Sequence, residues 1–152
     1  MPQPLAYTAA DGSFVLTTLQ TGDGAPAGNY AVTVENNRVY HNASTGISVH
    51  NGSTVRDNVV YSNSIGIQGV RGSYYYYFTG VIANNLVYAN TNQGIYLNTS
   101  TGGQVINNTV YQPVGDAVKL QNSPYVRLRN NILWVNSGYD LNVDSVSQVG
   151  FD

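Results

Sequence analysis

The 152-residue sequence contains no cysteine, so it offers neither a disulfide framework nor the Cys/His spacing of a metal site. Charge is scarce as well: Lys, Arg, Asp and Glu make up 9% of the chain, against about 25% in ordinary soluble domains. The net charge of -2 lacks the basic excess that nucleic acid or an anionic membrane surface requires. We therefore expect no nucleic-acid partner.

Long apolar stretches are also missing. No run of about 18 apolar residues occurs, so we expect no membrane insertion. The first residues lack a basic segment followed by an apolar one, and we expect no signal peptide in this sequence. Hydrophobic residues nevertheless make up 42% of the chain, which is enough for one core, and the polar residues are mostly uncharged.

An internal repeat centred on paired asparagines runs through the sequence. An Asn-Asn or Asp-Asn pair occurs five times, and its second residue recurs at intervals of 21, 27, 23 and 23 residues. The fullest copies read Asn-Asn-x-Val-Tyr-x-Asn, with an aliphatic residue three positions before the second Asn. The second residues of the pairs are Asn37, Asn58, Asn85, Asn108 and Asn131.

Each pair is followed, about nine residues later, by a Gly-Ile-x-Val-like segment that alternates apolar and polar residues. Alternation of this kind predicts short strands, and no window shows a convincing helical period. A unit of about 23 residues cannot bury its own apolar face, but units stacked in parallel can. Equivalent asparagines then form a column in which each amide donates to one neighbour and accepts from another. The sequence thus predicts an all-β, right-handed parallel β-helix of about five coils with an Asn ladder.

The domain organisation follows from where the pairs occur. Residues 32–152 are predicted to form the repeats. Residues 1–31 lack the Asn pair and are predicted to form an N-terminal cap or a degenerate coil, with Asp11-Gly12 at the Asn-Asn corner.

The two patterns together resemble the parallel β-helix repeats of the pectin-lyase-like superfamily, over Val32 to about Val146. Relatives include periplasmic copper-processing β-helices, alginate epimerases and repeat modules of large secreted bacterial proteins. The resemblance implies the fold and favours a module that lies outside the cell or on its surface. It does not decide activity, because the superfamily has catalytic and inert members.

Two surfaces are candidates for ligand binding. Strand alternation places Gln68, Tyr96 and Asn98 on an outward polar face, where amides and one ring suit a sugar chain; the alternative is an ordinary solvated face. The 27-residue repeat also carries an aromatic insertion that leaves the solenoid, and its alternative role is to cover its own side wall. The predicted binding residues of the insertion are Arg71, Tyr74, Tyr75, Tyr76 and Tyr77.

The repeat register suggests one carboxylate pair for catalysis. Asp116 and Asp140 take nearly equivalent positions in adjacent coils, about 5 Å apart if both point outward, and Lys119 lies close to the first. A polysaccharide lyase of this superfamily would need an acidic Ca²⁺ site and a basic residue, and a glycoside hydrolase would need two carboxylates. The alternative is that both aspartates cap turns. No cofactor is expected otherwise, and no metal ligand is identified.

These observations favour a non-catalytic β-helix scaffold, or a module that contacts carbohydrate, within a larger extracellular protein. The expected partners are a polysaccharide or a second copy of the chain, bound through open coil ends or an aromatic face. Two alternatives stay open: a polysaccharide lyase or uronate epimerase domain that acts on an acidic polysaccharide, and a self-assembly module.

Overall fold

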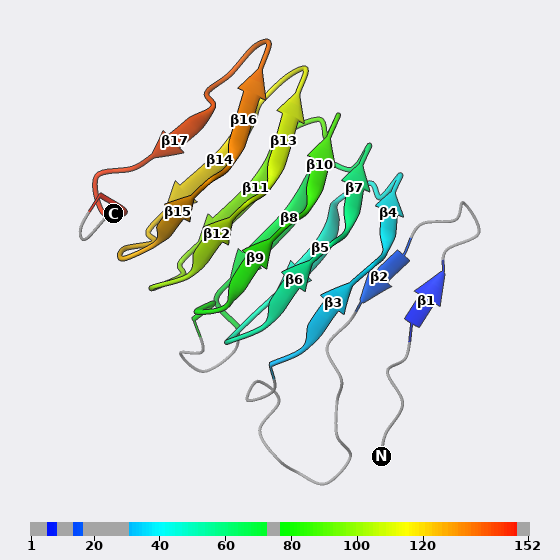
Figure 1. Ribbon diagram of the computed structural model, residues 1–152, viewed down its shortest axis with the longest axis horizontal. Helices are drawn as coiled ribbons and strands as arrows, with labels where there is room; N and C mark the ends of the chain where they lie inside the picture. Colours follow the sequence, from blue (N-terminus) through cyan, green and yellow to red (C-terminus); the bar gives the residue numbers. More distant parts are fainter. Residues whose placement is uncertain (1–5, 9–13, 17–30, 73–76, 149–152) are drawn as a thin grey trace, which may run out of the picture.

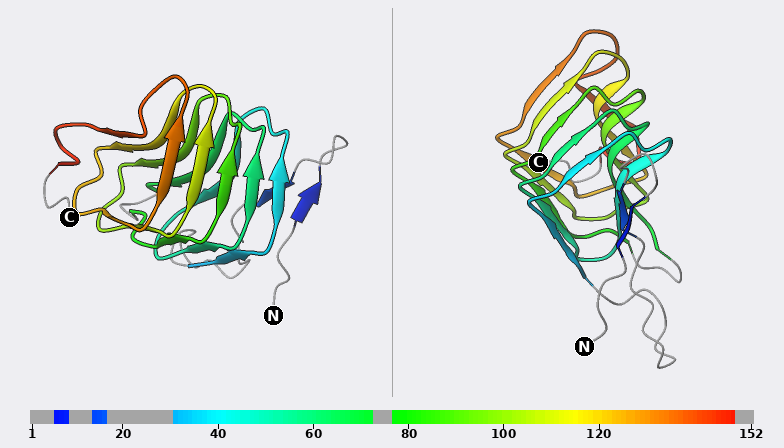
Figure 2. Two further views of the ribbon diagram at one scale, coloured as in Figure 1. Left: turned by 45° about the horizontal axis from the view of Figure 1, so that its top comes forward. Right: turned by 90° about the vertical axis from the view of Figure 1, so that its right-hand side faces the viewer.

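A computed structural model of the chain describes residues 6–8, 14–16, 31–72 and 77–148, which contain seventeen strands and no helix. Fifteen of these strands form three parallel sheets of five strands each (Figure 1). Each coil contributes one strand to every sheet, and the coils stack along one axis (Figure 2). The predicted all-β parallel β-helix of about five coils is therefore confirmed.

The three sheets are called the first, second and third sheet, in the order in which the chain enters them. The first sheet contains β3 (Thr33–Glu35), β6 (Thr54–Arg56), β9 (Val81–Ala83), β12 (Gln104–Ile106) and β15 (Arg127–Arg129). The second contains β4 (Arg38–Tyr40), β7 (Val59–Tyr61), β10 (Leu86–Tyr88), β13 (Thr109–Gln112) and β16 (Ile132–Val135). The third contains β5 (Thr45–Val49), β8 (Ile65–Val70), β11 (Gln93–Asn98), β14 (Asp116–Gln121) and β17 (Leu141–Val143).

The strand register is the one that the repeat predicts. In the first sheet Val34 pairs with Val55, which pairs in turn with Ile82, then Val105, then Leu128. These positions are separated by the expected 21, 27, 23 and 23 residues, and every pairing is parallel. Insertions in the repeat are therefore absorbed by the turns and leave the sheets unshifted.

The core lies between the three sheets and is filled from every strand. Because side chains alternate along a strand, the central residue of each short strand points inward. The central valines of β4, β7, β10 and β13 are at most 1% exposed. The main buried apolar residues are Val34, Val39, Ile47, Val49, Val55, Val60, Ile67, Phe78, Ile82, Val87, Ile95, Leu97, Val105, Val110, Val118 and Leu120.

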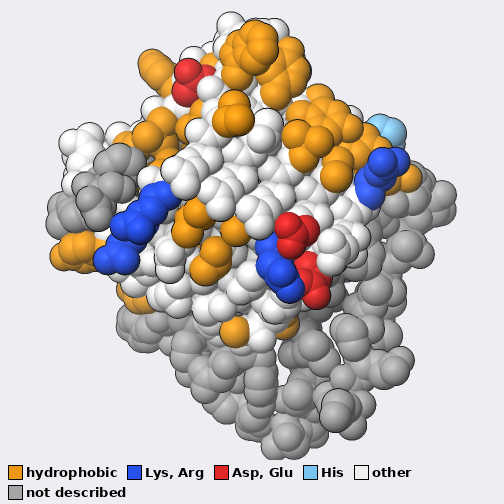
Figure 3. All heavy atoms as spheres, viewed as in Figure 1, with side chains coloured by type: hydrophobic (Ala, Val, Ile, Leu, Met, Phe, Trp, Pro, Cys, Tyr) orange, Lys and Arg blue, Asp and Glu red, His pale blue; other side chains and the backbone are white. Residues whose placement is uncertain are grey.

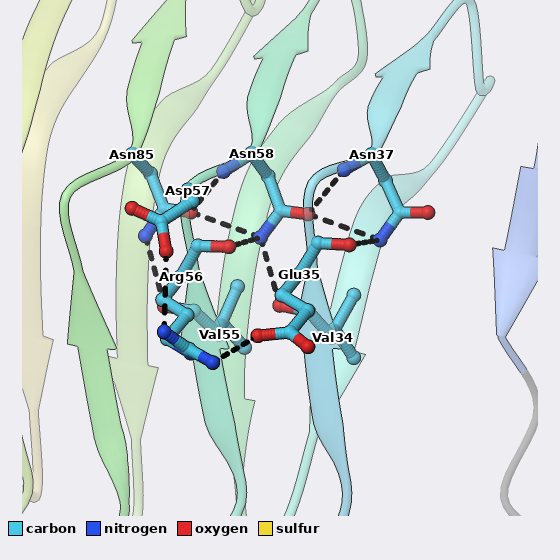
Figure 4. A network of polar contacts seen from close by, with 8 residues as sticks. All are labelled: Val34, Glu35, Asn37, Val55, Arg56, Asp57, Asn58 and Asn85. Atoms are coloured by element: carbon cyan, nitrogen blue, oxygen red, sulfur yellow. Dashed lines mark hydrogen bonds and ion pairs between the residues drawn. The ribbon is translucent and has the colours of Figure 1, made fainter.

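The corner between the first and second sheets is built by the Asn pairs. The first residue of each pair adopts a left-handed backbone, from φ 53° at Asn130 to φ 59° at Asn36, a conformation that Asn and Asp tolerate well. The second points inward, and in the first four coils its side-chain amide donates to the Oδ1 atom of the next coil's asparagine. The Asn37–Asn58 and Asn58–Asn85 bonds measure 3.1 and 3.0 Å (Figure 4). The predicted Asn ladder is thus confirmed.

A second ladder forms the corner between the second and third sheets. Asn42 donates to Asn63 at 2.8 Å and Asn63 donates to Asn90 at 3.1 Å. The chain runs close to these amides where it enters the third sheet, which explains the recurring glycine there. A Cβ atom at Gly66 would lie 2.8 Å from Asn90 Nδ2 and 2.5 Å from the Gly94 carbonyl oxygen.

Within residues 1–31 the structure describes β1 (Ala6–Thr8) and β2 (Phe14–Leu16), which pair antiparallel. Strand β2 lies against β5 of the first coil. The proposed Asp11-Gly12 corner lies outside the described residues, and the division at residue 31 stays a prediction. No helix in the described part has the length and hydropathy of a membrane span.

Candidate binding face of the third sheet

The predicted outward row runs in register across the third sheet. Ser48 pairs with Gln68, Gln68 with Tyr96, Tyr96 with Lys119, and Lys119 with Asn142. All five side chains are at least partly exposed, whereas their neighbours in the same strands fill the core. The face therefore presents one polar side chain per coil, at steps of about 4.8 Å.

Tyr96 lies at the centre of this row and is held by its neighbours. Its hydroxyl donates to Gln121 Oε1 at 2.6 Å, and Lys119 Nζ lies 5.7 Å from the ring centroid. Partial burial raises the pKa of the Tyr96 hydroxyl, and the nearby negative charge of Asp144 raises it further. Tyr96 is therefore a neutral hydrogen-bonding group with a fixed ring.

The remaining predicted binding residues of this face also have defined surroundings. Gln68 Oε1 accepts a hydrogen bond from the Thr45 hydroxyl at 3.2 Å. Asn98 pairs in register with Gln121 on β14, and its Oδ1 accepts from the Thr99 hydroxyl at 3.0 Å. The structure thus brings Gln68, Tyr96 and Asn98 onto one face, as the alternation predicts.

Asp144 closes the face beyond β17. Burial acts to raise its pKa, but hydrogen bonds from the Ser147 side chain and from backbone amides, including that of Asn122, bring the pKa below its ordinary value. The Asn122 amide lies 2.9 Å from Asp144 Oδ2. A charged carboxylate therefore stabilises the turn at this end of the face.

The aromatic insertion leaves the solenoid directly after β8 and is anchored by Phe78. This ring is fully buried, and it fills the space of a missing side chain, because Gly69 interrupts the inward column between Val49 and Leu97. A Cβ atom at Gly69 would lie 2.7 Å from Phe78 Cδ1. The end of the insertion is therefore part of the core.

The predicted binding residues of the insertion are described in part. Arg71 lies over the ring of Tyr77, with 5.4 Å between the guanidinium carbon and the ring centroid. Arg71 is exposed and Tyr77 is half-buried. Tyr74, Tyr75 and Tyr76 lie outside the described residues, so their predicted role stays a prediction.

The carboxylates proposed for catalysis are each engaged in turn structure. The register places Asp116 opposite Tyr139, one position from Asp140, which agrees with the nearly equivalent positions that the repeat gives the two carboxylates. Asp116 is largely buried and accepts from the Tyr139 amide at 3.1 Å and from Asn142 Nδ2 at 2.9 Å. Asp140 accepts from the Val135 amide at 3.0 Å. Lys119 lies beside Tyr96. Catalysis at these residues stays a prediction.

Aromatic residues on the outward side of the second sheet form a further surface. The rings of Tyr40, Tyr61 and Tyr88 stack in parallel, with centroids 5.1 and 4.9 Å apart. Further along, Tyr111 and Trp134 meet edge-on at 5.7 Å, and Trp134 is 66% exposed. Hydrophobic side chains gather over this sheet in Figure 3. All five rings stand three residues after the second Asn of their pair, so the repeat itself predicts that they form one outward column.

Comparison with known proteins gave one family match. The model of the family described as periplasmic copper-binding protein (NosD) matches residues 20–148. No curated protein and no solved structure matches the chain.

The family description includes copper binding, and the residues of this chain can be compared with the ligands that copper requires. Copper sites use Cys, Met and His ligands, and the sequence has no Cys, one Met and two His. The His41 ring lies edge-on to Tyr40 at 5.1 Å, and His50 Nδ1 lies 3.1 Å from the Val70 carbonyl oxygen. Among the described residues no group of three or more His, Cys, Asp or Glu is placed to hold a metal ion. These residues do not fit a copper site.

The matched range contains all five coils of the solenoid, from β3 to β17. It also covers well over half of the chain. The chain therefore belongs to the NosD family, a family of periplasmic parallel β-helix repeat proteins.

Proposed function

We propose that the chain is a non-catalytic β-helix module that acts outside the cytoplasm and contacts a polysaccharide through the outward face of the third sheet. The observation that carries this proposal is the row of Ser48, Gln68, Tyr96, Lys119 and Asn142, which places one polar group per coil around a central ring. The periplasmic character of the family supports the location.

The chemistry of the face suits sugar hydroxyls. Amides both donate and accept hydrogen bonds, and the Asn98–Gln121 pair provides a second line of amides beside the first. A polysaccharide that runs along the solenoid axis meets an equivalent backbone position at every step of about 4.8 Å. Since a parallel sheet of this kind is rigid, these groups need little ordering on binding, which favours affinity.

The hydrogen bonds of Asp116 and Asp140 favour a structural role for these two carboxylates over a catalytic one. Asp116 uses both carboxylate oxygens within the protein, and Asp140 caps a turn five residues earlier in the chain. A uronate lyase or epimerase makes a separate demand: the parent protein would have to act on an acidic polysaccharide, and Asp116→Asn would have to remove that activity. An assay of uronate-polymer cleavage by absorbance measures both.

The central test is a glycan array followed by affinity electrophoresis in gels that contain the best polysaccharide. We expect Tyr96→Ala to weaken retention at least about tenfold, as the loss of a central aromatic contact does. Tyr111→Ala is the matched control, because it removes an exposed tyrosine from the second sheet and should leave retention unchanged. Equal loss in both variants, or no retention of the parent protein by any glycan, contradicts the proposal.

We propose that the aromatic insertion also contacts the polysaccharide, and a separate experiment tests its contribution. Replacement of Tyr74 to Tyr77 by serine keeps Phe78, so the core anchor of the insertion stays in place. We expect the thermal midpoint to stay close to that of the parent protein and glycan retention to fall. A large drop of the midpoint with unchanged retention would instead assign these tyrosines to covering the side wall.

A further inference from the structure

The turn that leads from the third sheet back to the first differs between coils. Strand register places Asn51, Thr99 and Asn122 at equivalent positions, just after β5, β11 and β14. All three adopt a left-handed backbone, with φ values of 54°, 53° and 49°. Asn122 is followed by Ser123, which is fully buried. Asn51 is followed by Gly52, which is exposed. The turn of the first coil is therefore more open to solvent at this point than the turn of the fourth.

Hydrogen bonds restrain the turn of the fourth coil but leave that of the first coil free. The Ser123 amide donates to the Ser147 hydroxyl at 2.8 Å, and its own hydroxyl donates to the Leu97 carbonyl oxygen at 3.1 Å. Among the described residues, the Gly52 amide has no hydrogen-bond acceptor, and neither polar atom of the Asn51 side chain has a partner. The Asn51 side chain can therefore approach the Gly52 nitrogen without breaking such a bond.

Neither the backbone nor the packing requires a glycine at position 52. Gly52 does not adopt a positive φ, and a Cβ atom there would have one described neighbour within 4 Å, the Cβ of Ala31 at 3.9 Å. At Gly66 and Gly94, by contrast, an added Cβ would lie 2.5 Å from another atom. The turn can therefore accept alanine at position 52 without strain, which separates the chemistry of this glycine from its role in folding.

We propose that Asn51-Gly52 is a site of spontaneous deamidation in the folded protein, with water as the only other reactant. Asn is a thermolabile residue, and a following glycine leaves the attacking nitrogen unshielded. The Gly52 backbone nitrogen attacks Cγ of Asn51, and its proton passes through solvent to the leaving nitrogen, which departs as ammonia. Water then opens the succinimide ring at either carbonyl and gives aspartate or isoaspartate. One water is consumed, one ammonia is released, and nothing is oxidised or reduced.

The modification changes a contact that holds the end of the aromatic insertion. The Asn51 carbonyl oxygen accepts a hydrogen bond from the Thr79 amide at 2.9 Å, and Thr79 directly follows the buried Phe78. In isoaspartate the main chain continues through Cβ and Cγ of residue 51, and the carbonyl that accepted this bond becomes a free carboxylate. The turn thereby gains a backbone atom and a negative charge beside the anchor of the insertion.

Mass spectrometry of tryptic peptides, after incubation of the folded protein at mildly alkaline pH, tests the proposal. Cleavage after Arg38 and Arg56 releases one peptide that contains both Asn51 and Asn42. Asn42 is the internal control, because its side chain is held in the second ladder by Asn63 at 2.8 Å. We expect fragment spectra to place the change from amide to acid at Asn51 and to leave Asn42 unmodified. A sample digested before incubation corrects for conversion during digestion.

Gly52→Ala is the matched variant. We expect its conversion at Asn51 to be at least about tenfold slower, because the added methyl group shields the attacking nitrogen. Its thermal midpoint should equal that of the parent protein, since the Cβ atom has room. Equal conversion at Asn51 and Asn42, no conversion at Asn51 in the folded parent protein, or equal rates in the parent and Gly52→Ala overturns the proposal.

Limited trypsin cleavage at Arg71 tests the effect on the insertion, with Asn51→Asp as the control that adds the charge without lengthening the backbone. Labelling by an isoaspartyl methyltransferase identifies the fraction of the aged protein that carries isoaspartate. We expect this fraction to be cleaved at Arg71 faster than both the fresh parent protein and Asn51→Asp, because only isoaspartate displaces the acceptor of the Thr79 amide. Equal cleavage of all three proteins contradicts the link between this site and the insertion.

Discussion

The two asparagine ladders occupy equivalent corners of the same coils but differ in completeness. In the first ladder five asparagines follow one another without a break, from Asn37 to Asn131. In the second, three asparagines are followed by Gln112, which accepts from the Asn90 amide at 2.9 Å. The buried side-chain nitrogens of Asn90 and Gln112 both lack a hydrogen-bond partner among the described residues.

The difference shows how strictly a ladder depends on the backbone. In each of the first three coils, a residue with a left-handed backbone directly precedes the asparagine that belongs to the second ladder. These residues are His41, Ser62 and Ala89. In the fourth coil β13 runs on to Gln112, and the left-handed residue comes later, at Gly115 with φ 79°. The longer side chain reaches the ladder from a different backbone position. The Oε1 atom of Gln112 accepts the bond that an asparagine Oδ1 accepts in the other coils, but its Nε2 atom has no partner among the described residues.

The largest expected effect of a single change is that of Asn85→Ala in the complete ladder. Asn85 Oδ1 accepts from both the backbone and the side chain of Asn58, and its Nδ2 donates to Asn108 and to the Val55 carbonyl. Loss of these bonds leaves several buried groups unpaired, and we expect about 2–4 kcal/mol of destabilisation. Urea denaturation followed by Trp134 emission measures it. A loss below that of Asn90→Ala would contradict the ranking of the two ladders.

In the interrupted ladder the same change should cost less. Asn90 accepts two bonds from Asn63, but its own Nδ2 donates to no described group. Since Asn90→Ala also removes an unpaired buried donor, we expect about 1–2 kcal/mol of destabilisation. The same urea titration with the two variants side by side gives the difference directly. Identical midpoints would mean that the unpaired donor is satisfied by bound water.

A stabilising change is expected at the left-handed position of the second corner. Every such position in the first corner is Asn or Asp, whereas Ala89 adopts φ 53° with no polar side chain to favour it. Ala89→Asn should therefore stabilise the protein by roughly 0.5–1 kcal/mol. The thermal midpoint measures this gain. Asn84→Ala, at the equivalent residue of the first corner, is the matched reverse change, and a rise of the midpoint in that variant would refute the backbone argument.

The smallest effect is expected on the outward face. Asn98 is half-buried, and its side chain contacts the neighbouring Thr99 hydroxyl rather than a ladder. Asn98→Ala should cost less than about 0.5 kcal/mol, as for other surface changes. A cost equal to that of Asn85→Ala would show that this face is as tightly constrained as the corner.

Most of the fold could be predicted from the sequence because the repeat encodes it locally. The inward valines, the left-handed corner and the ladder all fall at fixed positions from each Asn pair, and the strand register follows from the spacing alone. The polar row of the third sheet could be predicted for the same reason, since alternation fixes which side chains point outward.

Features that depend on variable turns could not be predicted in this way. The extension of β13 brings Gln112 into the ladder position of the fourth coil, which the repeat spacing does not indicate. Asp116 and Asp140 lie one position apart in the register, and the backbone amides from which the two carboxylates accept depend on the turns around them. The role of Phe78 depends on a glycine nine residues earlier, and no local pattern connects the two.

The fit of Phe78 into the core has a consequence for how such a solenoid can change its length. The third and fourth repeats are each 23 residues long and carry their own ladder residues, so a duplicated copy of either would insert without a gap in the first ladder. The second repeat is different, because its ring needs the space left by Gly69 and by Gly103 of the following coil, where an added Cβ would lie 3.2 Å from the ring. Grafting that repeat elsewhere therefore requires both glycines to move with it, which makes it the least transferable unit of the chain.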